Sequence, residues 1–240
     1  LGILGGFGSC ALGLVIIQIY PALGWWPILL GLIGGPLSGM VYFKDKIVVG
    51  ITGGIASGKS AALKAFAELD WSTISTDEIV SDLWISEEKL IRTVQDHWGK
   101  NEIFSRGNID KEKIARIIFN NPKERAWLEN IIHPLVRSKW VSHVEQSVEK
   151  LQVVEVPLLF EKNLESYFSN IISVFVPVKI QFSRLLSRGF SEEEARTRIA
   201  SQLSCEEKAK KADVVFLGTG SEVFLSGQVQ EFSRNFSSQL

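Results

Sequence analysis

The hydrophobic pattern of this chain changes once, at residue 43. Residues 1–43 contain no Asp, Glu, Lys, Arg or His, and their two apolar runs, 1–20 and 27–43, are separated by a Pro and Gly break with paired tryptophans. An apolar run of about 20 residues can cross a bilayer as a helix, and tryptophans favour its interface. The pattern predicts a transmembrane hairpin that would tether a cytoplasmic domain, since Lys44 and Lys46 follow it directly. An unfolded or artefactual extension is the alternative.

The remainder of the chain alternates short β-branched runs with amphipathic stretches. Buried parallel strands are predicted by apolar runs at 46–51, 73–75, 152–156, 171–176 and 214–217. Residues 78–150 have helical periodicity, and Asn121-Pro122 is typical of a helix start. His97 and His143 fall in polar helical stretches and are expected to face solvent. This alternation predicts an α/β fold with a parallel sheet.

Composition narrows the class of protein. The formal net charge is −1, with 45% apolar and 22% charged residues. This balance excludes a disordered chain and argues against a nucleic-acid binder, which is usually basic. Two cysteines provide no disulfide framework, so a reducing compartment such as the cytoplasm is expected.

A glycine-rich segment joins the first predicted strand to a helix. Positions 53–60 match G-x-x-x-x-G-K-[ST], and the strand before and helix after are the context that this motif requires. Backbone N–H groups and the helix N-terminus bind phosphate oxygens, Lys59 can bridge the outer phosphates, and the Ser60 hydroxyl can bind Mg²⁺. The predicted ATP-binding residues are Gly53, Gly54, Ala56, Ser57, Gly58, Lys59, Ser60 and Ala61. No N-K-x-D segment is present, and the size of the body favours a small-molecule kinase over a GTPase or motor.

Two carboxylates fall near the ends of predicted strands. Asp77 follows a short strand, and strand ends lie beside the phosphate loop in a doubly wound sheet. A carboxylate there can accept a proton from an attacking hydroxyl or hold a metal-bound water. Capping of the next helix explains Asp77 equally well. Glu155 falls where a Walker-B carboxylate would lie.

Two further segments place cations at helical spacing. His133 precedes Pro134, which should interrupt the helix and turn the imidazole toward a cleft, with Arg137 one turn further. A packed kink with a surface arginine is the alternative. Arg184 and Arg188 share a helix face, and guanidinium groups neutralise a transferring phosphoryl group. This segment is either a lid or a solvated helix pair.

The ordered set of motifs resembles the dephospho-coenzyme A kinase family over about residues 46–235. The segments are ITGGIASGKS at 51–60, TDEI at 76–79, FNNP at 119–122, LENIIHPLVR at 128–137, EVPLLFE at 155–161, QFSRL at 181–185 and RIASQ at 198–202. Each segment alone is weak, whereas their order is specific. Ser75 stands where the family often has a first acid of an Asp-x-Asp pair.

The resemblance implies transfer of the ATP γ-phosphate to the ribose 3′-hydroxyl of dephospho-CoA, with Mg²⁺. It implies Asp77 as the base, Lys59 and Ser60 on phosphate and metal, His133 and Arg137 in the coenzyme pocket, and Arg184 and Arg188 in a lid. It further implies a P-loop kinase fold with five parallel strands flanked by helices. The expected parts are an extension at 1–43 and a kinase domain at 44–240, with the core at 44–77, 151–178 and 206–240, a helical substrate region at 78–150 and a lid at 179–205.

Two other functions stay open from the sequence. One is a different P-loop small-molecule kinase, of the nucleoside or shikimate type. The other is a nucleotide-binding module that has lost catalysis and serves a membrane partner. The sequence does not indicate an oligomeric state.

Overall fold

The structure is a computed structural model that describes residue 43, residues 45–105 and residues 108–237. All of these belong to one compact unit, residues 42–240. The predicted membrane hairpin lies outside the described residues except for Phe43, which is buried next to Trp140. Within the described ranges, no helix is both long and apolar enough to cross a membrane.

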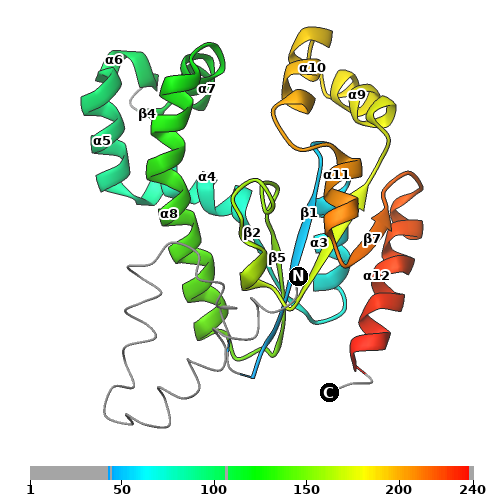
Figure 1. Ribbon diagram of the computed structural model, residues 1–240. Coiled ribbons are helices and arrows are strands. Elements are labelled where there is room, and N and C mark those ends of the chain that lie inside the picture. The colour runs from blue at the N-terminus through cyan, green and yellow to red at the C-terminus, as the bar shows by residue number, and fades with distance from the viewer. Residues whose placement is uncertain (1–42, 44, 106–107, 238–240) are drawn as a thin grey trace, which may run out of the picture. The chain divides into compact units, whose positions relative to one another are not determined.

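Five parallel strands form the central sheet in the order β2–β5–β1–β6–β7 (Figure 1). Their bounds are β1 Ile47–Gly53, β2 Ser72–Ser75, β5 Leu151–Glu155, β6 Asn170–Phe175 and β7 Val214–Leu217. Glu155 pairs with Ile51 on one side and with Ser75 on the other. The carboxyl ends of three strands therefore meet at one edge, and the predicted α/β fold with five parallel strands is confirmed.

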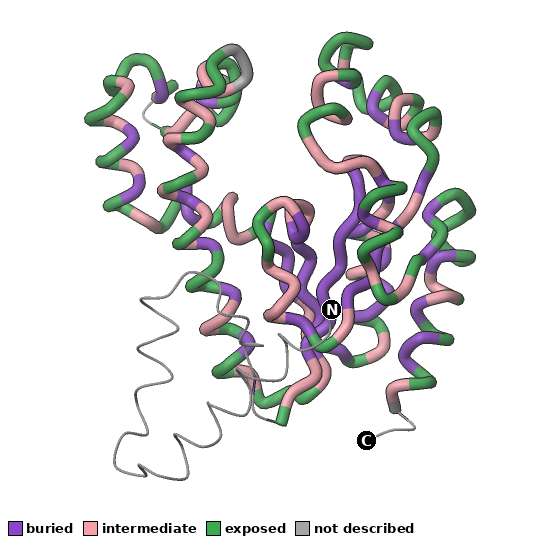
Figure 2. Tube along the Cα trace, viewed as in Figure 1, coloured by how far each residue is buried: buried purple, intermediate pink, exposed green. Residues whose placement is uncertain are grey.

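Helices cover both faces of this sheet. Val49 and Ile51 belong to a core that includes α3 (Lys59–Ala67) and α12 (Glu222–Ser237). Val48 belongs to a second core, with α4 (Thr76–Ser86) and α8 (Pro122–Gln146). Successive strand side chains point to opposite faces, so a strand buried on both faces has a continuous apolar run. Figure 2 shows the buried positions gathered along these strands.

A helical region connects β2 to β5. It comprises α4, α5 (Glu88–Trp98), α6 (Lys100–Ile103), α7 (Lys111–Asn120) and α8, with a short antiparallel hairpin of β3 (Phe104–Ser105) and β4 (Asn108–Ile109). Asn121 caps α8 by accepting hydrogen bonds from the Lys123 and Glu124 N–H groups, as its sequence predicts.

One expectation for this region is wrong, and another is confirmed. The helix does not stop at His133–Pro134, because α8 continues through Pro134 to Gln146. A proline removes one helical hydrogen bond, but burial of Trp140 and its neighbours in the core holds the following turns. His97 is exposed, as expected, and its ring also stacks on Trp127 at 3.7 Å while its Nε2 lies 2.8 Å from a Glu124 oxygen.

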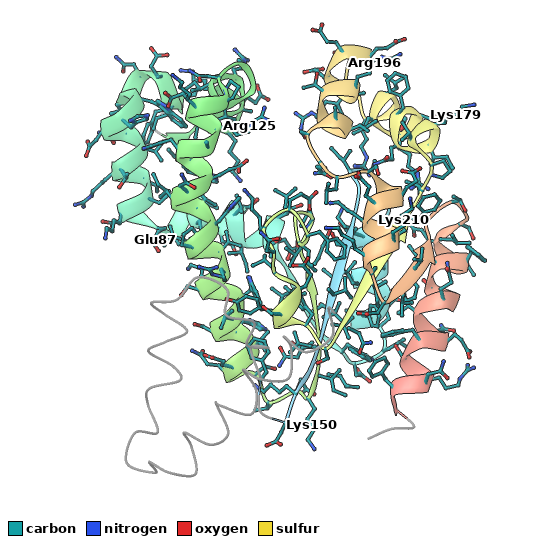
Figure 3. All side chains as sticks on the ribbon, viewed as in Figure 1. Glu87, Arg125, Lys150, Lys179, Arg196 and Lys210 are labelled. Carbon is teal, nitrogen blue, oxygen red and sulfur yellow. The ribbon has the colours of Figure 1, made fainter. Side chains whose placement is uncertain are left out.

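The segment after β6 forms two helices, α9 (Val178–Ser187) and α10 (Glu192–Ala200), followed by α11 (Cys205–Lys211). Buried Leu185 and Ala195 pack α9 on α10 and reach Ala56 of the glycine-rich loop. Figure 3 shows Lys179 pointing away from the rest of the molecule, on the outer side of this pair. A short 3-10 helix, Glu165–Tyr167, precedes β6.

Candidate active site

The glycine-rich loop lies between β1 and α3, as the sequence predicts. Gly53 and Gly58 have φ of +147° and +107°, which side chains with a Cβ rarely adopt. A Cβ on Gly53 would lie 2.5 Å from the Val174 carbonyl oxygen. These glycines allow the backbone to fold closely over β6 and to present its N–H groups at the start of α3.

Lys59 is buried within this loop. Its ammonium donates a 3.0 Å hydrogen bond to the Gly54 carbonyl oxygen. Burial lowers the pKa of Lys59, and the nearby Glu155 carboxylate opposes that change. The loop carbonyl therefore holds this buried cation in place.

Ser60 and Glu155 supply the oxygens of a candidate magnesium site. The Ser60 hydroxyl lies 3.4 Å from Glu155 Oε1, and only 3% of Glu155 is exposed. Burial raises the pKa of Glu155, although Lys59 works against it. In the described part of the chain, no cluster of three or more His, Cys, Asp or Glu residues could hold a metal. A hydroxyl and one carboxylate fit Mg²⁺, which takes its other ligands from water and from nucleotide phosphates.

Two cavities meet at Asp77. The larger, of about 780 Å³, is lined by the loop and by residues such as Arg184 and Arg188. We call it the nucleotide cavity. The smaller, the acceptor cavity of about 310 Å³, is lined by residues that include His133 and Arg137. Asp77 lines both cavities.

The capping explanation for Asp77 is excluded. The N-cap of α4 is Ser75, whose hydroxyl accepts the Glu78 N–H at 3.5 Å. Asp77 is the second residue of α4, exposed, and close enough to Lys59 and Glu155 to affect the charge of each. The carboxylate at the junction of the cavities is therefore available for chemistry.

Arg184 has partners that the sequence did not reveal. Its Nη1 donates to the carbonyl oxygens of Ala56 at 2.9 Å and Ser57 at 3.3 Å, and its Nη2 donates to Gly218 at 2.7 Å. This guanidinium therefore ties the loop to the turn after β7. Arg188, one helical turn further, is exposed at the end of α9 and also lines the nucleotide cavity.

On the acceptor side, His133 is half-buried. Burial and the nearby Lys162 both lower the pKa of its imidazole, with Glu129 opposing them. Lys162 forms a 2.8 Å ion pair with Glu129. Arg137 is exposed on the next turn of α8. The cleft-facing interpretation of His133 and Arg137 thus agrees with their positions, without the predicted break in the helix.

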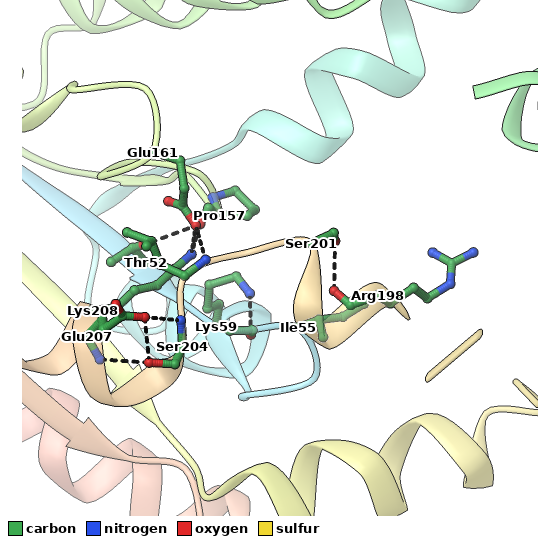
Figure 4. A network of polar contacts seen from close by, with 12 residues as sticks. Thr52, Ile55, Lys59, Pro157, Glu161, Arg198, Ser201, Ser204, Glu207 and Lys208 are labelled. Carbon is green, nitrogen blue, oxygen red and sulfur yellow. Dashed lines mark hydrogen bonds and ion pairs between the residues drawn. The ribbon is translucent and has the colours of Figure 1, made fainter. Parts of the chain in front are cut away.

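Sequence reasoning missed a fully buried cation, Lys208 on α11. Its ammonium binds Glu161 Oε1 at 2.9 Å and also donates to the Pro157 carbonyl oxygen, which accepts Thr52 Oγ1 at 3.1 Å (Figure 4). Glu161 also accepts the Leu203 N–H at 2.9 Å. This network joins the strand before the loop, the wall of the acceptor cavity and the end of the α9–α10 segment. Lys208 follows Cys205 by three residues, so the two share one face of α11, which is buried; this spacing was the signal available in the sequence.

A parallel sheet with a phosphate loop after its first strand, and two cavities meeting at one acid, defines a P-loop phosphotransferase. The dephospho-CoA kinase family model matches residues 47–222. The chain belongs to the dephospho-CoA kinase family, which confirms the resemblance of its motifs.

Individual relatives agree. A dephospho-CoA kinase of Geobacillus kaustophilus is 39% identical over 179 residues, covering 73% of this chain and 89% of the relative. A crystal structure of a Thermus thermophilus protein matches with a TM-score of 0.68 and 28% identity, over 80% of this chain and 98% of that one. Dephospho-CoA kinase from Campylobacter jejuni matches with a TM-score of 0.54 and 28% identity, over 80% and 97% of the two chains.

Proposed function

We propose that this chain transfers the γ-phosphoryl group of ATP to the ribose 3′-hydroxyl of dephospho-CoA, giving coenzyme A and ADP. The observation that carries the proposal is the position of Asp77, which lines both the nucleotide cavity and the acceptor cavity. A group at that junction can contact an acceptor hydroxyl while the γ-phosphate lies in the loop. Membership of the family gives the substrate pair.

On the nucleotide side, the loop N–H groups and Lys59 bind the β- and γ-phosphates, and Lys59 exchanges its Gly54 contact for phosphate oxygen. Ser60 would hold Mg²⁺ directly and Glu155 through water, and the ion would neutralise charge on the phosphates. Arg184 fixes the loop carbonyls, and because Arg184 and Arg188 both line the nucleotide cavity, they would neutralise charge on the transferring group.

On the acceptor side, His133 and Arg137 bind the coenzyme. Asp77 accepts the 3′-hydroxyl proton as the oxygen attacks phosphorus, and because its side chain is exposed the proton can pass to solvent. The turn between α9 and α10 contains Gly189 at φ +89°, which suits a segment that closes over ATP. The division into core, helical region and lid, and the membrane tether at residues 1–43, stay predictions.

The alternative of an inactive nucleotide-binding module is less well supported. Lys59, Ser60, Glu155 and Asp77 all line the nucleotide cavity, so each group that the reaction needs is present. A module that only binds nucleotide would not need an acid shared with a second cavity.

The test compares two carboxylates of the same helix. Asp77→Asn should lower the kcat for CoA formation by about 10²- to 10⁴-fold, because a general base is lost, while the Kd for ATP stays unchanged. Asp82→Asn, which alters an exposed residue of α4 outside both cavities, should leave kcat and Kd unchanged. Undiminished turnover by Asp77→Asn would remove the proposed base.

A further inference from the structure

Four consecutive carbonyl oxygens of the glycine-rich loop, those of residues 54–57, accept hydrogen bonds from side chains. Three of these oxygens bind Lys59 or Arg184, to which the proposed reaction already gives a role. The fourth, the carbonyl oxygen of Ile55, binds Gln181, to which it gives none. The amide of Gln181 thus completes a row of donors along the loop backbone.

Gln181 is a buried polar residue of α9, with 2% of its surface exposed. Its Nε2 donates a 2.7 Å hydrogen bond to Ile55, a residue 126 positions earlier in the chain. The same nitrogen lies directly against the loop, since a Cβ on Gly54 would come within 2.3 Å of it. Arg184 follows Gln181 by three residues, so both side chains project from one face of α9. That face of the helix is therefore attached to the loop.

The peptide that Gln181 binds lies next to a strained residue. Ala56 has a φ of +59°, in the left-handed region that residues with a Cβ seldom adopt. The carbonyl oxygen before Ala56 binds Gln181, and that of Ala56 itself binds Arg184. These two hydrogen bonds flank the strained residue and offset the cost of its conformation. A trans peptide points its carbonyl and its N–H in opposite directions, so Gln181 also fixes the direction of the Ala56 N–H.

We propose that Gln181 is a positioning residue for ATP, which holds the peptide between Ile55 and Ala56 so that the Ala56 N–H meets a phosphate oxygen. This inference rests on the proposed function, because it takes ATP as the ligand of the loop. Ala56 lines the nucleotide cavity, whereas Gln181 lines neither of the cavities that meet at Asp77. Gln181 therefore acts through the loop and not by touching a substrate.

The energetic effect is that of preorganisation. With Gln181 in place, ATP meets a loop that already has its binding conformation, and binding pays no cost for turning the peptide. Without Gln181, the left-handed conformation of Ala56 becomes one of several. The apparent Kd for ATP then rises in inverse proportion to the fraction of molecules that keep this conformation.

The test removes the amide and keeps the length of the side chain. Gln181→Met should raise the Kd for ATP about tenfold, the equivalent of one hydrogen bond, and leave the KM for dephospho-CoA unchanged. Tripolyphosphate, which has neither ribose nor base, should lose affinity by the same factor, because the Ala56 N–H serves the phosphates. Adding Ala56→Gly to Gln181→Met should restore part of the ATP affinity, since glycine adopts a positive φ without strain.

Gln152→Met is the matched control. Gln152 is a fully buried glutamine near the amino end of β5, and its Nε2 donates to the carbonyl oxygens of Val144 and Glu149 at 3.1 Å. Both Met variants should lower the midpoint of urea unfolding, but only Gln181→Met should weaken the binding of ATP. Gln181→Asn is one methylene too short to reach the loop, and it should weaken ATP binding likewise even if Gln181→Met folds poorly.

An ATP affinity equal to that of the wild-type protein in the Gln181 variants would overturn the inference. A loss of ATP affinity that tripolyphosphate does not share would also overturn it, as would a double variant that binds ATP no better than Gln181→Met. Binding titrations of the full chain measure all three without turnover. CoA formation by the wild-type protein tests the proposed function separately, so that a failure of one is distinguished from a failure of the other.

Discussion

The buried pair of Lys208 and Glu161 gives a prediction that depends on charge rather than on shape. Lys208 is completely buried, whereas 17% of the Glu161 side chain is exposed. Glu161→Gln keeps the shape and an acceptor for the Leu203 N–H but leaves the ammonium without its counter-charge. Loss of one partner from a buried ion pair costs about 3–5 kcal/mol of the free energy of unfolding.

The reverse change should cost less. Lys208→Met removes the buried charge itself, and the carboxylate of Glu161 can still take water and the Leu203 N–H. The Pro157 carbonyl oxygen keeps Thr52 as a donor. We expect a loss of about 1–2 kcal/mol, comparable with one or two lost hydrogen bonds. The double variant should be more stable than Glu161→Gln alone, because no charge is then left unpaired.

Thermal and urea unfolding, followed by circular dichroism, measure these differences. For a unit of this size, the cost of Glu161→Gln corresponds to a fall in Tm of roughly 6 to 20 °C. The reasoning would be refuted if Glu161→Gln cost less than about 1 kcal/mol, or if Lys208→Met were the more damaging change. Either result would mean that water solvates the pair in the folded protein, so that neither charge depends on the other.

Two further predictions concern the loop and the metal site. Gly218→Ala should weaken ATP binding at least about tenfold, because the new Cβ would lie 2.2 Å from the Ser57 carbonyl oxygen. The control is Gly227→Ala in α12, whose Cβ would meet nothing within 4 Å, so its effect on stability should be neutral or slightly favourable. Equal ATP affinities of the two variants in a titration would contradict this prediction. Burial raises the pKa of the Glu155 carboxyl above its usual 4.5, so the folded state binds the carboxyl proton more tightly than the unfolded chain does. The free energy of unfolding therefore falls as the pH rises above 4.5. Glu155→Gln should therefore stabilise the ligand-free protein at pH 7 but not at pH 4, as measured by urea unfolding, and it should lower magnesium-dependent turnover. Destabilisation at pH 7 would show that the contact between Lys59 and Glu155 outweighs burial.

Local patterns were sufficient for the elements that position the loop. β-branched runs predicted all five strands of the sheet, and the strand–loop–helix context placed Lys59 and Ser60 correctly. Asn121 and Pro122 marked the start of α8 because capping depends only on neighbouring residues. Asp77 was left between two roles, and the structure decides against capping because the hydroxyl of Ser75, two residues earlier, takes the N-cap position.

Features set by distant contacts were missed. Pro134 stays within α8 because packing of Trp140 against the core compensates for the lost hydrogen bond, and no local pattern carries that information. The hairpin of β3 and β4 has two residues in each strand, too few to produce a visible alternation. Arg184 and Lys208 bind carbonyl oxygens that are distant in sequence, so their basic character indicated phosphate contact or solvent exposure instead.

The central claim is that Asp77 joins an ATP site to an acceptor site for a sugar hydroxyl. It is tested most directly by incubating the full chain with ATP, Mg²⁺ and dephospho-CoA, and locating the new phosphate by phosphorus NMR and mass spectrometry. The account predicts one new phosphomonoester on the ribose 3′ oxygen, formed with one ADP for each acceptor consumed. ATP hydrolysis that leaves dephospho-CoA unmodified, or phosphate at another position, would contradict it.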